Sequence, residues 1–140
     1  MTANEYPRPA LGEIVYCRFP EIIGKPGPKP RPALVVKIGE FADKTMAVVV
    51  AYGTSQGTDK LHSGEFLISP TDGEGYRVAG LSFPTKFDLR HTATLPYTDE
   101  WFRVPPSPSY GQTPKLGILH PGLMRRAQAA FNAALPPQPT

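Results

Sequence analysis

The chain has 140 residues, of which 40% are hydrophobic and 19% are charged, and its formal net charge is +3. This length and composition favour one compact core and exclude a disordered polyelectrolyte. No stretch approaches the roughly 20 apolar residues that span a bilayer, and Met1 to Pro9 lacks the apolar run of a signal peptide. We expect one cytoplasmic domain over residues 1–140, with its core at about 10–135, flexible tails at 1–9 and 136–140, and no membrane association.

The first predicted element is a strand from Gly12 to Phe19. Its side chains alternate with a period of two, Val15, Cys17 and Phe19 on one face and Ile14, Tyr16 and Arg18 on the other. Cys17 lies in this apolar run and is the only cysteine, so it has no partner for an internal disulfide. We expect Cys17 to be a buried small apolar residue and not a nucleophile. The stretch from Pro20 to Pro30 is rich in proline and glycine, which predicts a loop.

Positive charge is concentrated in and around this loop. One acid, Glu21, stands among several cations, which are Arg18, Lys25, Lys29, Arg31 and Lys37. Such a cluster favours a phosphate-bearing partner. The alternative is a solvated loop whose charge keeps the protein soluble.

The next predicted strands are apolar, β-branched runs separated by turn residues. They span Ala33 to Ile38, Thr45 to Tyr52, Gly64 to Ser69, Tyr76 to Phe83 and Lys86 to Leu95. The proline-rich segment from Pro96 to Pro114 predicts an irregular excursion with one short strand or an aromatic anchor around Trp101.

The only predicted helix comes last. Pro121 suits its first turn, and Leu123, Ala127, Phe131 and Leu135 recur at a spacing of four, which predicts one packed face. About five to seven short strands, many turns and one terminal helix are typical of a mainly β fold built as a small twisted barrel.

Arg31 is the first candidate for chemistry. It stands between Pro30 and Pro32, which stiffen the backbone and can aim a guanidinium whose fork of donors suits a phosphate. The alternative is an ordinary exposed arginine where a strand begins.

Thr54, Ser55 and Gln56 form the second group, directly after a buried strand. A sheet can hold their hydroxyl and backbone N–H groups where they reach a phosphate. At a turn, however, hydroxyl side chains usually bond their own backbone.

The third group includes Arg90 and His91. His91 is the best placed histidine for a general base near neutral pH, with an incidental histidine as the alternative. The histidines show no metal-ligand spacing with Cys17 or with carboxylates, so we expect no structural metal. Nucleophile-elbow, P-loop and dinucleotide-binding motifs are also absent from the sequence, and we expect no cofactor.

Several stretches resemble the MazF/PemK family of toxins from type II toxin-antitoxin systems. The strand at Gly12–Val15, a Gly/Pro-rich loop and then Lys29–Val36 match the family's opening, with its R-P-x-[LIV]-[VI] motif. The run Val48–Ser55 resembles the family's buried strand that ends in a Thr-Ser or Thr-Thr pair. Lys86–Thr92 resembles a later strand, and Gly117–Leu119 with the final helix resembles the family's ending.

The resemblance covers roughly Ala10 to Leu135. It implies an SH3-like barrel that forms a homodimer and acts as an mRNA interferase. Such an endoribonuclease cuts single-stranded RNA without a metal, because the ribose 2′-OH attacks its own phosphate and leaves a 2′,3′-cyclic phosphate and a 5′-OH. It also implies a cognate antitoxin with an acidic, apolar tail, and DNA contact only through that antitoxin.

By the same motifs, Arg31 would donate to the phosphate or the leaving oxygen, and Thr54 would stabilise charge on the phosphorane. The other implied RNA contacts are Lys25, Lys29, Ser55, Gln56, Arg90 and His91. The general base stays unassigned, since arginine is a poor base. Relative to the family pattern, Tyr52 replaces a frequent proline and the segment from Tyr97 to Pro114 is an addition.

Two other readings of the sequence stay open. One is a barrel without nuclease activity that holds RNA or a peptide in the same groove, and the other is an interaction protein that uses the barrel only as a scaffold.

Overall fold

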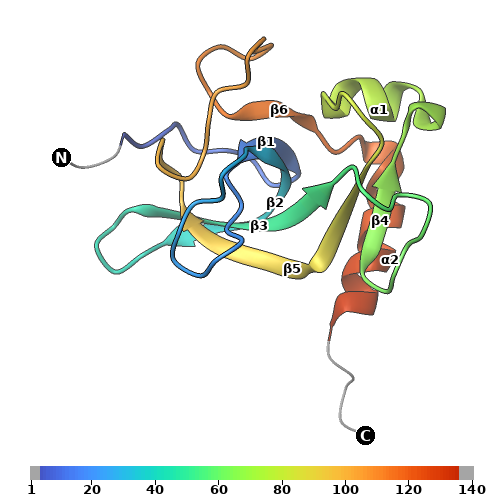
Figure 1. Ribbon diagram of the computed structural model, residues 1–140, viewed down its shortest axis with the longest axis horizontal. Coiled ribbons are helices and arrows are strands. Elements are labelled where there is room, and N and C mark those ends of the chain that lie inside the picture. Colours follow the sequence, from blue (N-terminus) through green and yellow to red (C-terminus); the bar gives the residue numbers. More distant parts are fainter. Residues whose placement is uncertain (1–3, 136–140) are drawn as a thin grey trace, which may run out of the picture.

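The computed structural model describes residues 4–135, which form six strands in a single antiparallel sheet (Figure 1). The strands are β1 (Glu13–Cys17), β2 (Arg31–Glu40), β3 (Met46–Thr54), β4 (Glu65–Ile68), β5 (Thr85–Pro96) and β6 (Lys115–Ile118). Their order across the sheet is β4-β5-β3-β2-β1-β6. Among the described residues β4 and β6 do not pair, so the sheet is not closed. The predicted mainly β fold with a C-terminal helix is confirmed, as an open form of the small barrel.

Two hydrophobic clusters lie on the two faces of this sheet. Val15, Val35 and Val50 belong to the first cluster, whereas their neighbours Leu34 and Ala51 belong to the second. Successive side chains of a strand point to opposite faces, so the middle strands are buried on both sides. This explains why their sequences read as continuous apolar runs.

The segment from Tyr76 to Phe83 contains no strand, so that prediction is wrong: its first four residues belong to a helix and the rest form a turn. A short 3-10 helix, η1 (Pro70–Asp72), leads into α1 (Glu74–Ala79), which ends at Gly80 in the left-handed conformation with φ 70°. A side chain on Gly80 would overlap the backbone carbonyl of Leu116 in β6. A glycine is therefore required where α1 ends against the backbone of β6, a contact that a local pattern does not reveal.

The predicted C-terminal helix is confirmed as η2 (Pro121–Leu123) followed by α2 (Met124–Ala134), which lies against β4 and β5 (Figure 1). Its packed face differs from the prediction, because Leu123 and Ala130 are buried whereas Phe131 and Leu135 are 44% and 47% exposed. Four residues of an α-helix turn through about 40° more than one full turn. Side chains spaced by four residues therefore rotate away from the packed face of the helix after two or three repeats.

The excursion after β5 is anchored by aromatic side chains, as predicted. Trp101 and Phe102 are buried, and Phe102 pairs with Cys17 in an isolated β-bridge. Residues 4–9, predicted as part of a flexible tail, run beside this excursion, with the Tyr6 N–H donating to the Tyr97 carbonyl at 3.0 Å. The tail predictions for residues 1–3 and 136–140 lie outside the described residues.

None of the helices in the described part of the chain is long and apolar enough to cross a bilayer.

We predict that Cys17 is unreactive in the native protein. Its side chain is fully buried, and that burial raises the pKa of the thiol, so the nucleophilic thiolate does not form at neutral pH. A thiol reagent such as Ellman's reagent should react slowly in buffer and rapidly in denaturant. Rapid reaction of the folded protein would contradict this placement.

Candidate functional site

The site begins where β2 starts and β3 ends. Ala33 pairs with Tyr52 in the antiparallel register of these strands, so the residues before Ala33 lie beside those after Tyr52. At Gly53 a side chain would overlap the carbonyl oxygen of Pro32. The absence of a side chain therefore lets the strands approach closely enough to bring Arg31 and Thr54 together.

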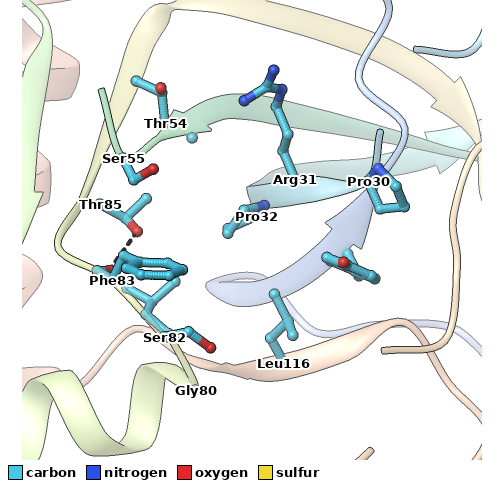
Figure 2. Close-up of a pocket in the computed structure, with 13 residues that line it drawn as sticks. Pro30, Arg31, Pro32, Thr54, Ser55, Gly80, Ser82, Phe83, Thr85 and Leu116 are labelled. Carbon is cyan, nitrogen blue, oxygen red and sulfur yellow. Dashed lines mark hydrogen bonds between the residues drawn. The ribbon is translucent and has the colours of Figure 1, made fainter. Parts of the chain in front are cut away.

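A pocket of about 250 Å³ opens between these strand ends (Figure 2). Three of the residues predicted from the sequence line it, namely Arg31, Thr54 and Ser55. Figure 2 draws the Arg31 guanidinium and the Thr54 side chain extending to the same side of the strand ends. At the strand ends the pocket thus combines the Arg31 cation with the hydroxyl groups of Thr54 and Ser55, a set that suits an anionic oxygen.

The Arg31 guanidinium is held only loosely. Its side chain is 33% exposed, and its Nη2 atom lies 3.9 Å from Oε1 of Glu21, which is 59% exposed. An exposed ion pair at this separation contributes little stability and is readily exchanged for another anion. Arg31 can therefore turn its fork of donors to a phosphate.

The Thr54 hydroxyl takes part in a turn. The backbone N–H of Gln56 donates to Thr54 Oγ1 at 3.1 Å, which is the local bond that a turn threonine usually makes. In this bond the oxygen is only the acceptor. The hydroxyl hydrogen remains available for a ligand, so Thr54 can make this local turn bond and also donate to a phosphate.

The other predicted RNA contacts lie outside this pocket. Lys25 and Lys29 are exposed on the loop between β1 and β2, and Gln56 is exposed in the turn after β3. Arg90 lies against Gly64 near α2, and His91 packs against aromatic rings at a second hollow. The structure therefore groups Arg31, Thr54 and Ser55 but distributes the remaining residues around them.

Other lining residues, among them four from more distant parts of the chain, were not predicted as site residues. Tyr16 and Leu116 come from β1 and β6, and Ser82 and Phe83 come from the turn after α1. The sequence placed Ser82 and Phe83 at the end of a strand, so nothing marked them as pocket residues. Phe83 is 66% exposed, a conspicuous exposure for an aromatic side chain beside a polar pocket.

A buried ion pair supports the turn after Thr54. Lys86 pairs with Thr54 across the β5–β3 ladder, and its Nζ atom donates to Glu65 Oε1 at 3.2 Å and to the Lys60 carbonyl at 3.1 Å. The side chains of Lys86 and Glu65 are only 10% and 9% exposed. Through its ladder pairing with Thr54 and its bond to the Lys60 carbonyl, Lys86 connects the two ends of the turn that carries Ser55.

Glu65 is ionised in this arrangement. Burial by itself would raise the pKa of its carboxyl, but the His62 backbone N–H and the Lys86 ammonium outweigh that effect and lower it. The hydrogen bonds from this cation and this N–H group offset the cost of burying the Glu65 carboxylate.

Among residues 4–135, no group of three or more histidine, cysteine or acidic side chains is arranged to hold a metal ion.

Comparison with models of known protein families identifies the family of this chain. Residues 10–135 match the model of the PemK-like, MazF-like toxins of type II toxin-antitoxin systems. The chain belongs to this toxin family. The match covers all six strands and α2, so Arg31 and Thr54 lie within the family domain.

A solved structure with a similar fold is described as an endoribonuclease in complex with its cognate antitoxin from Mycobacterial species. It is 20% identical in sequence and aligns with a TM-score of 0.57 over 94% of this chain and 100% of the other. At this identity the likeness concerns the fold. A search of curated protein sequences found no match.

We predict that Lys86→Met destabilises the protein by about 3 kcal/mol, because it leaves the Glu65 carboxylate buried without its cation. Urea unfolding followed by circular dichroism measures this change. Lys44→Met is the matched control, since the Lys44 ammonium is 84% exposed beside Glu40 and its loss should change stability little. Equal effects of the two variants would contradict the role assigned to Lys86.

The same pair predicts a pH dependence. Because folding lowers the pKa of Glu65, its carboxylate adds stability above the ordinary glutamate pKa of 4.5, and this contribution is lost as pH falls through the lowered value. Glu65→Gln should therefore be less stable than the wild type at pH 7, and the difference should shrink below about pH 4.5. A difference that is constant from pH 7 to pH 3 would contradict this assignment.

Proposed function

We propose that this protein is the toxin of a type II toxin-antitoxin pair and acts as a metal-independent endoribonuclease on single-stranded RNA. The observation that carries the proposal is the pocket in which Arg31 and Thr54 meet at two strand ends of a PemK-like, MazF-like chain. The description of the similar solved structure as an endoribonuclease supports it.

In the proposed reaction the ribose 2′-OH attacks the adjacent phosphorus, and the bond from phosphorus to the 5′ oxygen breaks. The proton of the 2′-OH passes to a base that we do not assign, and the leaving oxygen gains a proton as it becomes a 5′-OH. Arg31 donates to the phosphate oxygens, where negative charge accumulates in the transition state. Thr54 donates its free hydroxyl hydrogen to the same group. The products are a 2′,3′-cyclic phosphate and a 5′-OH end.

The loop between β1 and β2 favours RNA over a neutral substrate. Lys25 and Lys29 are exposed on it, and neither lines the pocket, so their ammonium groups can meet phosphates that neighbour the one at Arg31. Ser55 and Gln56 directly follow Thr54 in the same turn and extend a polar path for the strand.

We further propose that the toxin acts in the cytoplasm as a homodimer and is silenced by a cognate antitoxin. An antitoxin with an acidic tail would compete with RNA for the Arg31 pocket and for the cations of the loop. The toxin would meet DNA only through that antitoxin.

The second candidate is a module that binds RNA or a peptide without cutting it. The local bond from Gln56 to Thr54 favours this candidate to some extent, because it gives the hydroxyl a structural role that needs no substrate.

The deciding experiment is cleavage of a long single-stranded RNA by the purified protein in EDTA, with the new ends mapped. We expect 5′-OH ends, and a rate about a hundredfold lower for Arg31→Ala and for Thr54→Ala, the usual cost of removing one transition-state donor. Thr54→Ser should retain most activity because it keeps the hydroxyl, whereas Arg31→Lys should lose much of it because it loses the fork.

Arg125→Ala is the matched control for Arg31→Ala, because Arg125 is exposed on α2 away from the pocket. Circular dichroism should verify that every variant is folded. Binding of RNA without cleavage by the wild type would favour the second candidate. Cleavage that both alanine variants retain would remove Arg31 and Thr54 from the mechanism.

A further inference from the structure

A second, larger hollow of about 600 Å³ adjoins the Arg31 pocket. Aromatic and aliphatic side chains from separate parts of the chain line it, among them Phe19, Ile23, Phe41, His91 and Trp101. Ile23 is 98% exposed, so the hollow has an apolar wall with nothing packed on it. The function proposed above gives this hollow no role.

The His91 side chain packs against two aromatic rings at this hollow. Its ring centroid lies 5.0 Å from that of Phe19, with an interplanar angle of 83°, and 4.9 Å from that of Tyr52, with an angle of 39°. The pairing of β5 with β3 jumps from Asp88 to Thr92, so the intervening residues bulge out of the ladder. The bulge leaves His91 exposed while two rings fix its position.

The excursion after β5 contributes the far wall through Trp101. The Arg18 N–H donates to the Trp101 carbonyl at 2.8 Å, and Arg18 Nε donates to the Gly27 carbonyl at 2.9 Å. Arg18 therefore joins the excursion to the loop that carries Ile23. Sequence patterns predicted only an aromatic anchor in this excursion, whereas in the structure Trp101 also helps to form the hollow.

One ion pair connects the hollow with the Arg31 pocket. Glu21 lines the hollow, and its carboxylate is the group that lies 3.9 Å from the Arg31 guanidinium. Tyr52, which supports His91, precedes Thr54 by two residues on the same strand and therefore points to the same face of the sheet. A chain whose phosphate lies at Arg31 would thus extend its next unit toward His91.

The lining of the hollow identifies the kind of unit that fits. No lysine or arginine lines it, so it offers no lasting counter-charge to a phosphate or to an acidic peptide. Exposed aromatic rings bind unpaired nucleobases by stacking, and this binding tolerates different bases. The volume of about 600 Å³ leaves room for a flat ring.

We propose that this hollow binds one unpaired nucleobase of the RNA beside the cleaved phosphate, with the base stacked on His91 and flanked by Ile23 and Trp101. The proposal rests on the function proposed above and adds to it the position of a base-binding subsite. It also gives the excursion after β5 a role in substrate recognition.

The test uses a short RNA that carries 2′-deoxyribose at the mapped cleavage position, so that it binds but is not cut. The fluorescent base 2-aminopurine, which is quenched on stacking, is placed at one position at a time. We expect the wild type to quench it at a single position beside the cleaved phosphate. His91→Ala should abolish this quenching and weaken binding roughly tenfold or more, whereas His91→Phe should retain both because it keeps a ring.

Two matched controls separate stacking from general damage. His62→Ala removes an exposed histidine outside the hollow, and Ile22→Ser alters the exposed neighbour of Ile23 that does not line it. Both should leave the quenching unchanged, whereas Ile23→Ser should weaken it.

The outcomes are distinct. RNA that is bound and cut by the wild type but quenched at no position overturns the base-binding subsite and leaves the endoribonuclease standing. Quenching that His91→Ala retains also overturns it, as does an equal loss in His62→Ala. A folded wild type that neither binds nor cuts RNA overturns both proposals, and the hollow would then suit an apolar segment of a partner protein.

Discussion

The close approach of β2 and β3 at Gly53 is the constraint on which the candidate site depends. The backbone of Gly53 lies against the Pro32 carbonyl where any side chain would overlap it, and this contact fixes the register at the strand ends. A shift of one residue would turn Thr54 to the opposite face of the sheet from Arg31. Two residues that are far apart in the sequence therefore meet because of one missing side chain, and the pocket follows from their meeting.

Two cations hold the loops next to these strand ends, and both act on backbone carbonyl groups. Arg18 holds the loop before Arg31 through the Gly27 carbonyl, and Lys86 holds the turn after Thr54 through the Lys60 carbonyl. The charged groups of this region thus have two roles. Partly or fully buried cations position the backbone, whereas the exposed cations of the loop remain free for phosphate. Net charge alone does not distinguish these roles, because it counts both kinds equally.

Local pattern predicted the fold best where the local and tertiary preferences agree. The apolar runs that became β2 and β3 are buried on both faces, so β-branched composition and burial point to the same structure. The pattern failed at Tyr76–Phe83, where α1 ends at Gly80 in close backbone contact with Leu116. It also placed Phe131 on the packed face of α2, although small alanines make that contact and the larger ring remains exposed. In both cases the deciding partner is distant in the sequence.

The sequence by itself determined the class of fold, the family motifs and the residues that meet at the strand ends. These follow from residue types and spacings along the chain, which record strand periodicity, stiff prolines and the placing of Arg31 and Thr54 beside buried runs. Only the tertiary structure decided that Glu21 lies beside Arg31, that Lys86 carries the turn after Thr54, and that the excursion after β5 forms a hollow with His91. Each of these depends on how loops and strands fold back on one another, which the spacing of residues along the chain does not encode.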